Sequence, residues 1–170
     1  MEFMELENSV NINVQKELIH YFSKNDYKHI KMVVQQNRIT SDDEFLKKAC
    51  YLYKENHIVI NYSYLKWIMK NGVYTNEYLL EYIMNVFKET MMYHKKFILH
   101  MNSNHLTMMD IDKYYLFIKN ISLIMKESFP NKLDKCFVYN APFIFSKLFS
   151  ILSVFIDKAT LQKIQIVDLD

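Results

Sequence analysis

Apolar residues recur every three or four positions along the first third of the chain, which predicts helices there. Residues 10–23 show this spacing clearly, and residues 27–37 show a weaker version of it. A third helix is predicted over residues 42–54, because Ser41 can cap its start and acidic residues follow in its first turn. Its apolar positions are Phe45, Leu46, Ala49, Cys50 and Tyr53.

The pattern changes at His57, where a run of β-branched and aromatic residues predicts a strand. Further strands are predicted at residues 96–101, 134–139 and 164–167. Helices are predicted between these strands, one beginning after a capping Thr75 and the others over residues 111–128 and 142–156.

Strands that alternate with helices imply crossover connections and parallel pairing. We therefore expect an α/β fold with a small, mainly parallel sheet of about four strands and crossover helices. The predicted domains are a short helical N-terminal part over residues 1–55 and a second domain over residues 56–170. An all-helical fold is the main alternative, because a short apolar run does not distinguish a strand from a buried helix.

Composition narrows the possible functions. Hydrophobic residues make up 51% of the 170 positions, enough for a sizeable core. The net charge of +2 and the single arginine, Arg38, give no electrostatic footprint for nucleic acid. The single glycine, Gly72, excludes a Walker loop and a dinucleotide fingerprint, because both need several glycines. No apolar run reaches the roughly 18–20 residues of a membrane-spanning helix.

Candidate catalytic and metal-binding residues are sparse. Cys50 and Cys136 are isolated and lack the CxxC spacing of zinc sites, so we expect reduced thiols in a cytosolic protein. His94, His100 and His105 lie close in sequence, but their segments need not converge, and packing or surface roles are the default. No nucleophile elbow is present. We therefore predict a protein that is not an enzyme and that holds no metal and no cofactor.

Residues 129–164 carry a succession of motifs at fixed spacing. The motifs are Phe129-Pro130-Asn131-Lys132, Asn140-Ala141-Pro142, Phe155-Ile156-Asp157, Thr160 and Lys163-Ile164. This succession resembles the CRAL-TRIO lipid-binding domain family, which includes the phosphatidylinositol/phosphatidylcholine transfer proteins, and it needs no gap. The similarity extends over residues 58–168, about two thirds of the chain.

The resemblance implies an internal cavity for a single lipid or other hydrophobic ligand, which the protein binds and possibly transfers. Helix 142–156 would gate the cavity. The implied ligand-binding residues are Phe97, Leu99, Met101, Phe145, Leu148, Phe149, Leu152 and Ile156, with Lys163 at the mouth for a phosphate or carboxylate. The implied partners are this ligand, a transient membrane surface and a possible protein partner, with no nucleic acid. The expected location is cytoplasmic and peripheral to membranes.

Several positions depart from the family pattern. Phe97 and Leu99 stand where phospholipid-transfer members carry headgroup hydroxyls, and Asn131 stands where an acid is expected. A buried headgroup without polar partners costs several kcal/mol, so a less polar ligand, a differently bound phospholipid or an unused cavity fits better. The family's segment beyond the last strand is also missing from the sequence. The alternative function is therefore a shortened CRAL-TRIO fold that acts as a protein-interaction scaffold without a ligand.

Overall fold

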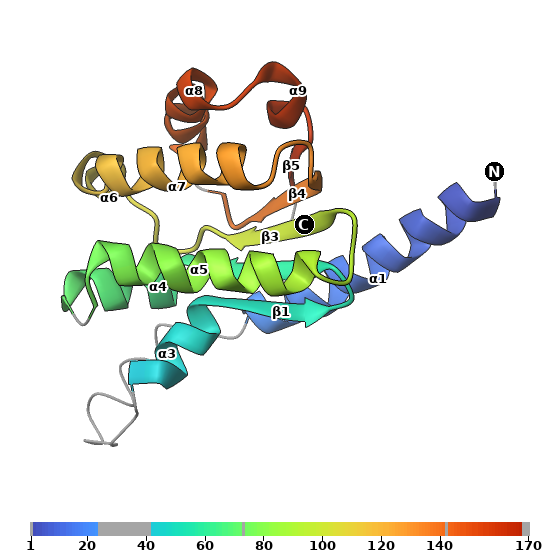
Figure 1. Ribbon diagram of the computed structural model, residues 1–170, viewed down its shortest axis with the longest axis horizontal. Helices are drawn as coiled ribbons and strands as arrows, with labels where there is room; N and C mark the ends of the chain where they lie inside the picture. The colour runs from blue at the N-terminus through green and yellow to red at the C-terminus, as the bar shows by residue number, and fades with distance from the viewer. Residues whose placement is uncertain (1, 24–41, 73, 142, 168–170) are drawn as a thin grey trace. The chain divides into compact units, whose positions relative to one another are not determined.

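The computed structural model describes residues 2–23, 42–72, 74–141 and 143–167. They belong to two units, one that contains helix α1 (Glu2–Ser23) and one that extends from α3 (Asp42–Ala49) to the last strand (Figure 1). Helix α1 includes the helix predicted over residues 10–23 and begins earlier, at Glu2. The helix predicted over residues 27–37 lies outside the described residues. The domain boundary between residues 55 and 56 stays a prediction.

The second unit is built on a sheet of five strands. The strands, in their spatial order, are β1 (Cys50–Lys54), β2 (His57–Asn61), β3 (Phe97–Asn102), β4 (Leu133–Tyr139) and β5 (Ile164–Ile166). β1 pairs with β2 in antiparallel fashion, and every other neighbouring pair is parallel. The expected α/β fold with a mainly parallel sheet is thus confirmed, and the all-helical alternative is wrong.

The prediction of a helix over residues 42–54 is wrong in its last part. The helix α3 ends at Ala49, and residues 50–54 form β1 instead. Cys50 pairs with Ile60 across the ladder, and the turn between the strands is made with Glu55 at a φ of 48°. The half-buried Tyr51 and Tyr53 alternate with the exposed Leu52 and Lys54, which suits a strand. The pairing with β2 therefore overrides the helical spacing.

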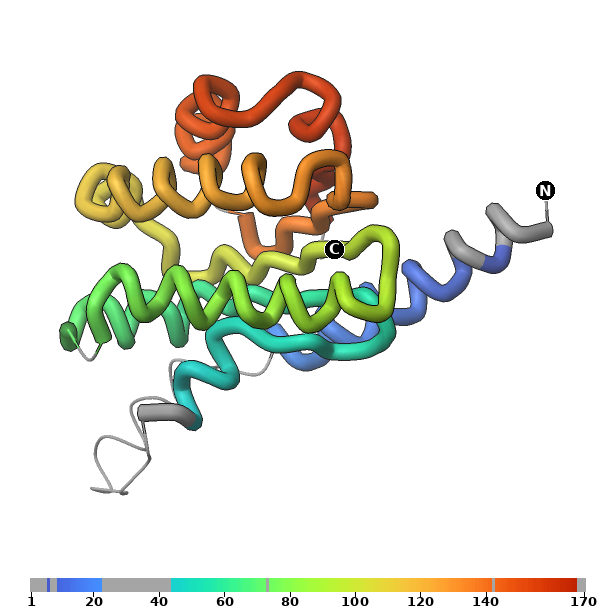
Figure 2. The backbone as a smooth tube through the Cα atoms, viewed as in Figure 1, coloured from blue at the N-terminus to red at the C-terminus, as the bar shows by residue number. Residues whose placement is uncertain are grey.

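Helices connect the parallel strands. α4 (Tyr62–Lys70) and α5 (Asn76–Met91) lie between β2 and β3, α6 (Met108–Lys113) and α7 (Tyr115–Ser128) between β3 and β4, and α8 (Phe145–Phe155) and α9 (Lys158–Leu161) between β4 and β5. The predicted cap of α5 is confirmed, because the Thr75 hydroxyl accepts a hydrogen bond of 3.1 Å from the Tyr78 amide. The helix predicted over residues 111–128 is interrupted at Tyr114, which separates α6 from α7. Helices α5 and α7 lie next to each other (Figure 2).

Three asparagines join the carboxyl ends of three neighbouring strands. Asn102, at the end of β3, donates from Nδ2 to Oδ1 of Asn61 at the end of β2 (3.4 Å). Asn140, directly after β4, donates from Nδ2 to Oδ1 of Asn102 (2.9 Å). Asn61 also caps α4 by accepting a hydrogen bond of 3.3 Å from the Ser63 amide. We call these three residues the asparagine row.

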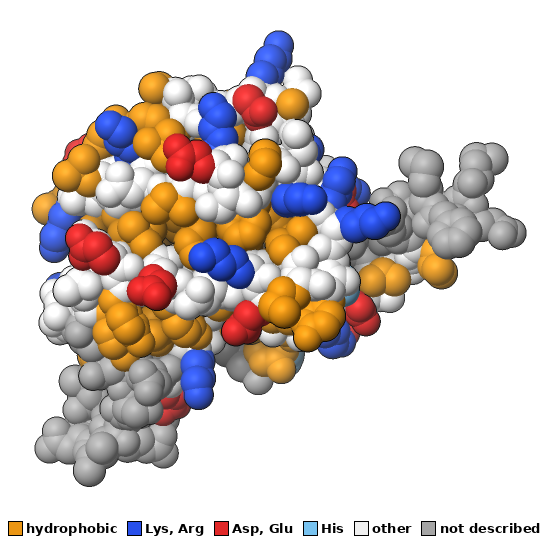
Figure 3. Space-filling model, in the orientation of Figure 1, with side chains coloured by type: hydrophobic (Ala, Val, Ile, Leu, Met, Phe, Trp, Pro, Cys, Tyr) orange, Lys and Arg blue, Asp and Glu red, His pale blue; other side chains and the backbone are white. Residues whose placement is uncertain are grey.

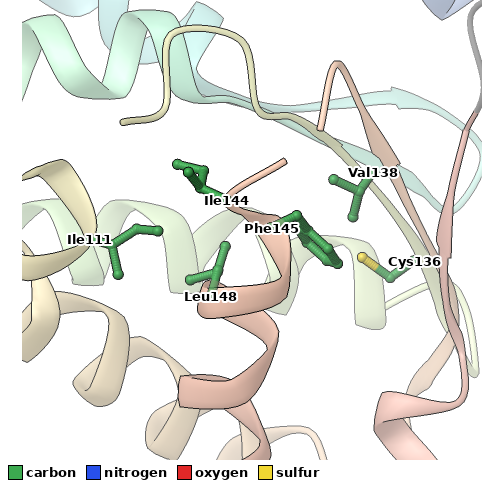
Figure 4. Close-up of a cluster of buried hydrophobic side chains, with 6 residues drawn as sticks. All are labelled: Ile111, Cys136, Val138, Ile144, Phe145 and Leu148. Carbon is green, nitrogen blue, oxygen red and sulfur yellow. The ribbon is translucent and has the colours of Figure 1, made fainter. Parts of the chain in front are cut away.

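Side chains from α6, β4 and the α8 segment form a buried apolar cluster (Figure 4). Its members are Ile111, Cys136, Val138, Ile144, Phe145 and Leu148. Burial raises the pKa of Cys136 to about 12, so this thiol stays neutral. Helix α8 is the helix predicted over residues 142–156; its described part begins at Phe145, and Pro142 lies outside the described residues. The cluster fixes the first turns of α8 against the sheet.

Candidate functional site

A cavity of about 450 Å³ lies between the sheet and the helices of the second unit. Strands β2, β3 and β4 form one wall, and helices α4, α5, α7 and α8 form the others. The lining is almost wholly apolar. Figure 3, drawn in the orientation of Figure 1, shows apolar side chains gathered in a band between the positions of α5 and α7. The cavity falls within the range of about 300–1,000 Å³ that is typical of small-molecule sites.

The strand wall is set by the alternation of side chains across the sheet. Phe97, Leu99 and Met101 are alternate residues of β3, and all three line the cavity, where the sequence placed them. Met101 is in register with Ile60 on β2 and Val138 on β4, which line the cavity as well. The parallel register therefore extends an apolar surface across three strands.

Helix α8 and its C-cap supply the opposite wall. The residues from this segment that line the cavity are Phe145, Leu148, Leu152 and Ile156. Phe149, which was predicted with them, is not a lining residue and instead packs against the buried apolar cluster. Lys163 is not a lining residue either, because its Nζ donates a hydrogen bond of 2.7 Å to the backbone carbonyl of Leu133. Seven of the nine predicted residues thus surround one cavity; their contact with a ligand stays a prediction.

Sequence reasoning missed the wall that α7 provides. Its lining residues are Phe117, Ile118, Ile121, Ser122 and Met125. They recur at the spacing of one helix face, which was the available signal. The nearly continuous apolar content of residues 111–128 concealed this face, because residues on the other side of the helix, such as Leu116 and Leu123, are apolar and exposed.

One end of the cavity is polar. Tyr62 begins α4, Ser103 follows β3, and Asp110 lies in the first turn of α6. Nζ of Lys66 lies 3.0 Å from Oδ2 of Asp110, and the same oxygen accepts a hydrogen bond of 3.1 Å from the Thr107 amide. Burial alone would raise the pKa of Asp110, but these donors outweigh it and hold the pKa below its ordinary value. Asp110 is therefore an ionised, paired carboxylate.

Two hydroxyls at this polar end are buried without hydrogen-bond partners among the described residues, namely those of Tyr62 and Ser103. Burial, reinforced by the charge of Asp110, raises the pKa of Tyr62, so its phenol is neutral. The phenol lies near this carboxylate but makes no hydrogen bond of acceptable geometry with it. Most buried polar groups in proteins have a partner, so two exceptions in one place call for an explanation. Sequence reasoning missed them, because only the strand order brings positions 62 and 103 together.

The other end of the cavity lies at the far end of α7, whose 14 residues span about 21 Å. Lys126, Asn131, Asp157 and Thr160 line it. Asn131, where the family resemblance led us to expect an acid, has a φ of 58°. Asp157 accepts a hydrogen bond of 2.9 Å from the Thr160 amide and so caps α9. Asp157 and Thr160 are thus bonded to each other, unlike the buried hydroxyls at the first end.

No histidine in the described part of the chain lines the cavity. His100 points away from it, with Nε2 2.8 Å from Nδ1 of His57 and Nδ1 2.7 Å from the Tyr139 hydroxyl. Among the described residues, no group of three histidines, cysteines or acids is placed to hold a metal ion. Within the same part of the chain, no helix combines the length and the apolar character needed to cross a membrane.

The chain is similar to known proteins in sequence and, for one solved structure, in fold. The CRAL/TRIO domain family matches residues 48–169. The Sec14 cytosolic factor of Schizosaccharomyces pombe is 38% identical over 56 residues, which cover 33% of this chain and 20% of that protein. The solved structure titled "Crystal structure of Sfh5" has a TM-score of 0.62 at 12% identity and covers 76% of this chain and 50% of that one.

These matches span half or less of the length of either relative, and the structural likeness bears on the fold alone. CRAL-TRIO proteins form a family of lipid-binding and lipid-transfer proteins. The family match covers well over half of the sequence and includes every strand of the sheet. The chain therefore belongs to the CRAL/TRIO domain family.

Proposed function

We propose that this protein binds a single hydrophobic ligand in the cavity between the sheet and helices α7 and α8. The observation that carries the proposal is an apolar cavity of about 450 Å³ in a small domain that also has a buried hydrophobic core. Protein interiors are normally close-packed, and a hollow of this size forfeits contacts. Burial of an acyl chain restores them and contributes about 0.8 kcal/mol per methylene.

Helix α8 is the element that we propose as the gate. Its first turns are held by Phe145 and Leu148 in the buried apolar cluster. On its outer side, the ion pair of 2.9 Å between Lys147 and Asp112 is exposed to solvent. Exposed ion pairs contribute little, about 0–1 kcal/mol, so this contact does not lock the helix. Leu152 and Ile156 line the cavity from the second half of the segment, and movement of this half opens it.

We further propose a transient contact with membranes through the α8 segment. Phe143, which precedes α8, is 94% exposed, and Val154, in the last turn of α8, is 75% exposed, so they lie near the two ends of the gate. Large apolar side chains that project into solvent can enter a membrane interface and place the gate against lipid. A cytoplasmic, non-enzymatic role fits the neutral buried thiols of Cys50 and Cys136 and the name of the cytosolic relative.

Phosphatidylinositol is disfavoured as the ligand. Phe97 and Leu99 face the cavity with apolar side chains at the two positions where hydroxyls would hold a headgroup. Asn131 supplies an amide where an acid was expected, and Lys163 is bonded to a backbone carbonyl. A strongly polar headgroup would lose its hydrogen bonds to water and find few protein groups to replace them, at a cost of several kcal/mol.

Lipid analysis of the purified chain tests the proposal. Native mass spectrometry and organic extraction after detergent-free purification are expected to reveal one bound lipid per chain. The Leu148→Asp variant should lose it, because a charge would enter the apolar wall. Ser150→Asp, an exposed position on the same helix, is the matched control and should keep the lipid.

The main alternative is a protein-interaction scaffold whose cavity takes no ligand. The observation in its favour is the cluster that already packs the first half of α8 against β4. A ligand-free mass for the wild-type chain, with no uptake of added lipid, would support the scaffold and contradict the binding proposal.

A further inference from the structure

We infer that the polar end of the cavity, formed by Tyr62, Ser103 and Asp110, receives the hydroxyl group of an uncharged lipid of the long-chain alcohol type. This inference rests on the proposed function and adds the chemical class and the orientation of the ligand. The hydroxyl lies at the α4–α6 end, and the chain runs along α7 towards Met125.

The first support is the pair of buried hydroxyls. Ser103 is 1% exposed, lines the cavity, and its Oγ has no hydrogen-bond partner among the residues that the structure describes. Tyr62 as a residue is half-buried, but its hydroxyl oxygen is buried at the cavity, near the Asp110 carboxylate and without a hydrogen bond of acceptable geometry among the described residues. An unsatisfied buried hydroxyl costs about 1–3 kcal/mol, so two of them facing one cavity are a substantial cost without a ligand.

The second support is that the backbone fixes both residues. The Ser103 amide donates to the Tyr139 carbonyl (2.9 Å), and its carbonyl accepts from the Leu106 amide (3.1 Å). Tyr62 is the first residue of α4 and directly follows the cap Asn61. The backbone is therefore fixed at both residues, and both hydroxyls are buried at the cavity.

The third support is the local charge. The Asp110 carboxylate is buried, with 8% of the residue exposed, and it is neutralised by Lys66. Lys66 also donates to the His105 carbonyl (2.9 Å), so its ammonium is already engaged. An anionic headgroup would meet the Asp110 charge, and a cationic one would meet Lys66. A neutral hydroxyl avoids both repulsions, because it can accept from Tyr62 or Ser103 and donate to the carboxylate.

Three probes of equal chain length test the inference: 1-hexadecanol, hexadecane and palmitic acid. Each is titrated from cyclodextrin against a fluorescent apolar reporter bound to the full chain. The Tyr62→Phe/Ser103→Ala double variant should weaken hexadecanol binding about tenfold and leave hexadecane binding unchanged, since the hydrogen bond that these hydroxyls donate to the alcohol is lost. Wild-type protein should bind palmitic acid more weakly than hexadecanol at neutral pH.

Thr90→Ala is the matched control. Thr90 is a buried residue of α5 that does not line the cavity, and its hydroxyl donates to the Val86 carbonyl (2.8 Å), so its removal should leave the three affinities unchanged. The single Ser103→Ala variant keeps the test valid if the double variant misfolds, which circular dichroism would show. If the variants change hexadecanol and hexadecane binding equally, or change neither, the inference is wrong although the cavity binds lipid. If no probe displaces the reporter, the proposed function itself is wrong.

Discussion

Nδ1 of His57 lies 2.8 Å from Nε2 of His100, and the two imidazoles share a buried hydrogen bond on the sheet face opposite the cavity. The other ring nitrogen of His100 contacts the Tyr139 hydroxyl. An imidazole pair joined in this way needs one nitrogen that donates and one that accepts. Protonation of both rings would remove the acceptor and place two positive charges side by side. The hydrogen bond between the rings therefore requires at least one neutral histidine.

Acid should destabilise the fold through this pair. Burial, with a further contribution from the charge of His57, lowers the pKa of His100 to about 3. Burial also lowers the pKa of His57, against the opposing charges of Glu55 and Asp134. An unfolded histidine titrates near pH 6.5. Below about pH 6.5 the unfolded state binds the extra proton first, so the free energy of unfolding falls with pH by up to about 1.4 kcal/mol per unit for each histidine.

Urea unfolding between about pH 7 and pH 5.5 measures this slope above the range where most carboxylates titrate. The His100→Gln variant is expected to be less stable overall and to have a shallower slope. His94→Gln, outside the buried pair, should keep the wild-type slope. An unchanged slope in His100→Gln would show that the acid sensitivity arises elsewhere.

Loss of the α6 cap should affect both stability and ligand choice. Thr107 and Asp110 form a capping box in which each side chain accepts from the other's amide (3.2 and 3.1 Å). Thr107→Ala should lower the free energy of unfolding by about 1 kcal/mol, because the Asp110 amide loses its acceptor. It should also reduce the preference for hexadecanol, because the first turn of α6, which carries the Asp110 carboxylate, is then held less firmly. Thr75→Ala removes a comparable cap from α5 and should lower stability without changing that preference. If the preference for hexadecanol is the same in the two variants, the α6 cap has no role in ligand recognition.

Filling the cavity should prevent ligand uptake. Met125 lines the cavity from α7, so Met125→Trp places a bulky ring where the ligand chain would lie. We expect at least a tenfold loss of reporter affinity and a stability change within about 3 kcal/mol. Leu123→Trp adds the same ring at a position on the same helix that is 36% exposed and does not line the cavity. A similar loss in both variants would point to a general disturbance of α7.

Membrane attachment should depend on the residues that flank the gate. The Phe143→Ser/Val154→Ser variant is expected to sediment several-fold less with phosphatidylcholine/phosphatidylserine vesicles, because less apolar surface can enter the interface. Met92 and Tyr93, which are 73% and 82% exposed after α5, provide the control pair when changed to serine. Equal losses in the two pairs would mean that exposed apolar area, rather than the α8 segment, determines vesicle binding.

Local patterns were sufficient for some elements. The alternation in β3 placed Phe97, Leu99 and Met101 on one face, and the three-to-four spacing in α8 placed Leu148 and Leu152 on one stripe. In both elements the buried face is decided by residues within a few positions of one another. The family motifs at residues 129–164 lie within the stretch that matches the family, residues 48–169.

Other features depend on contacts between distant residues. Strand β1 exists because β2 is beside it, and the spacing of residues 50–54 alone also suits a helix. Phe149 belongs to the α8 stripe by spacing, yet the packing of that helix directs it to the buried cluster. Tyr62, Ser103 and Asp110 meet only because β2 and β3 are neighbouring parallel strands whose ends lie at one edge of the sheet.

The asparagine row has a mechanical consequence. Asn61, Asn102 and Asn140 link three strand termini through side-chain amides, in addition to the backbone ladder. Spreading of these strands would break both sets of bonds at once, so we expect the sheet to be the more rigid wall of the cavity. On this expectation a ligand would be admitted by displacement of a helix, and the strand floor would keep its shape.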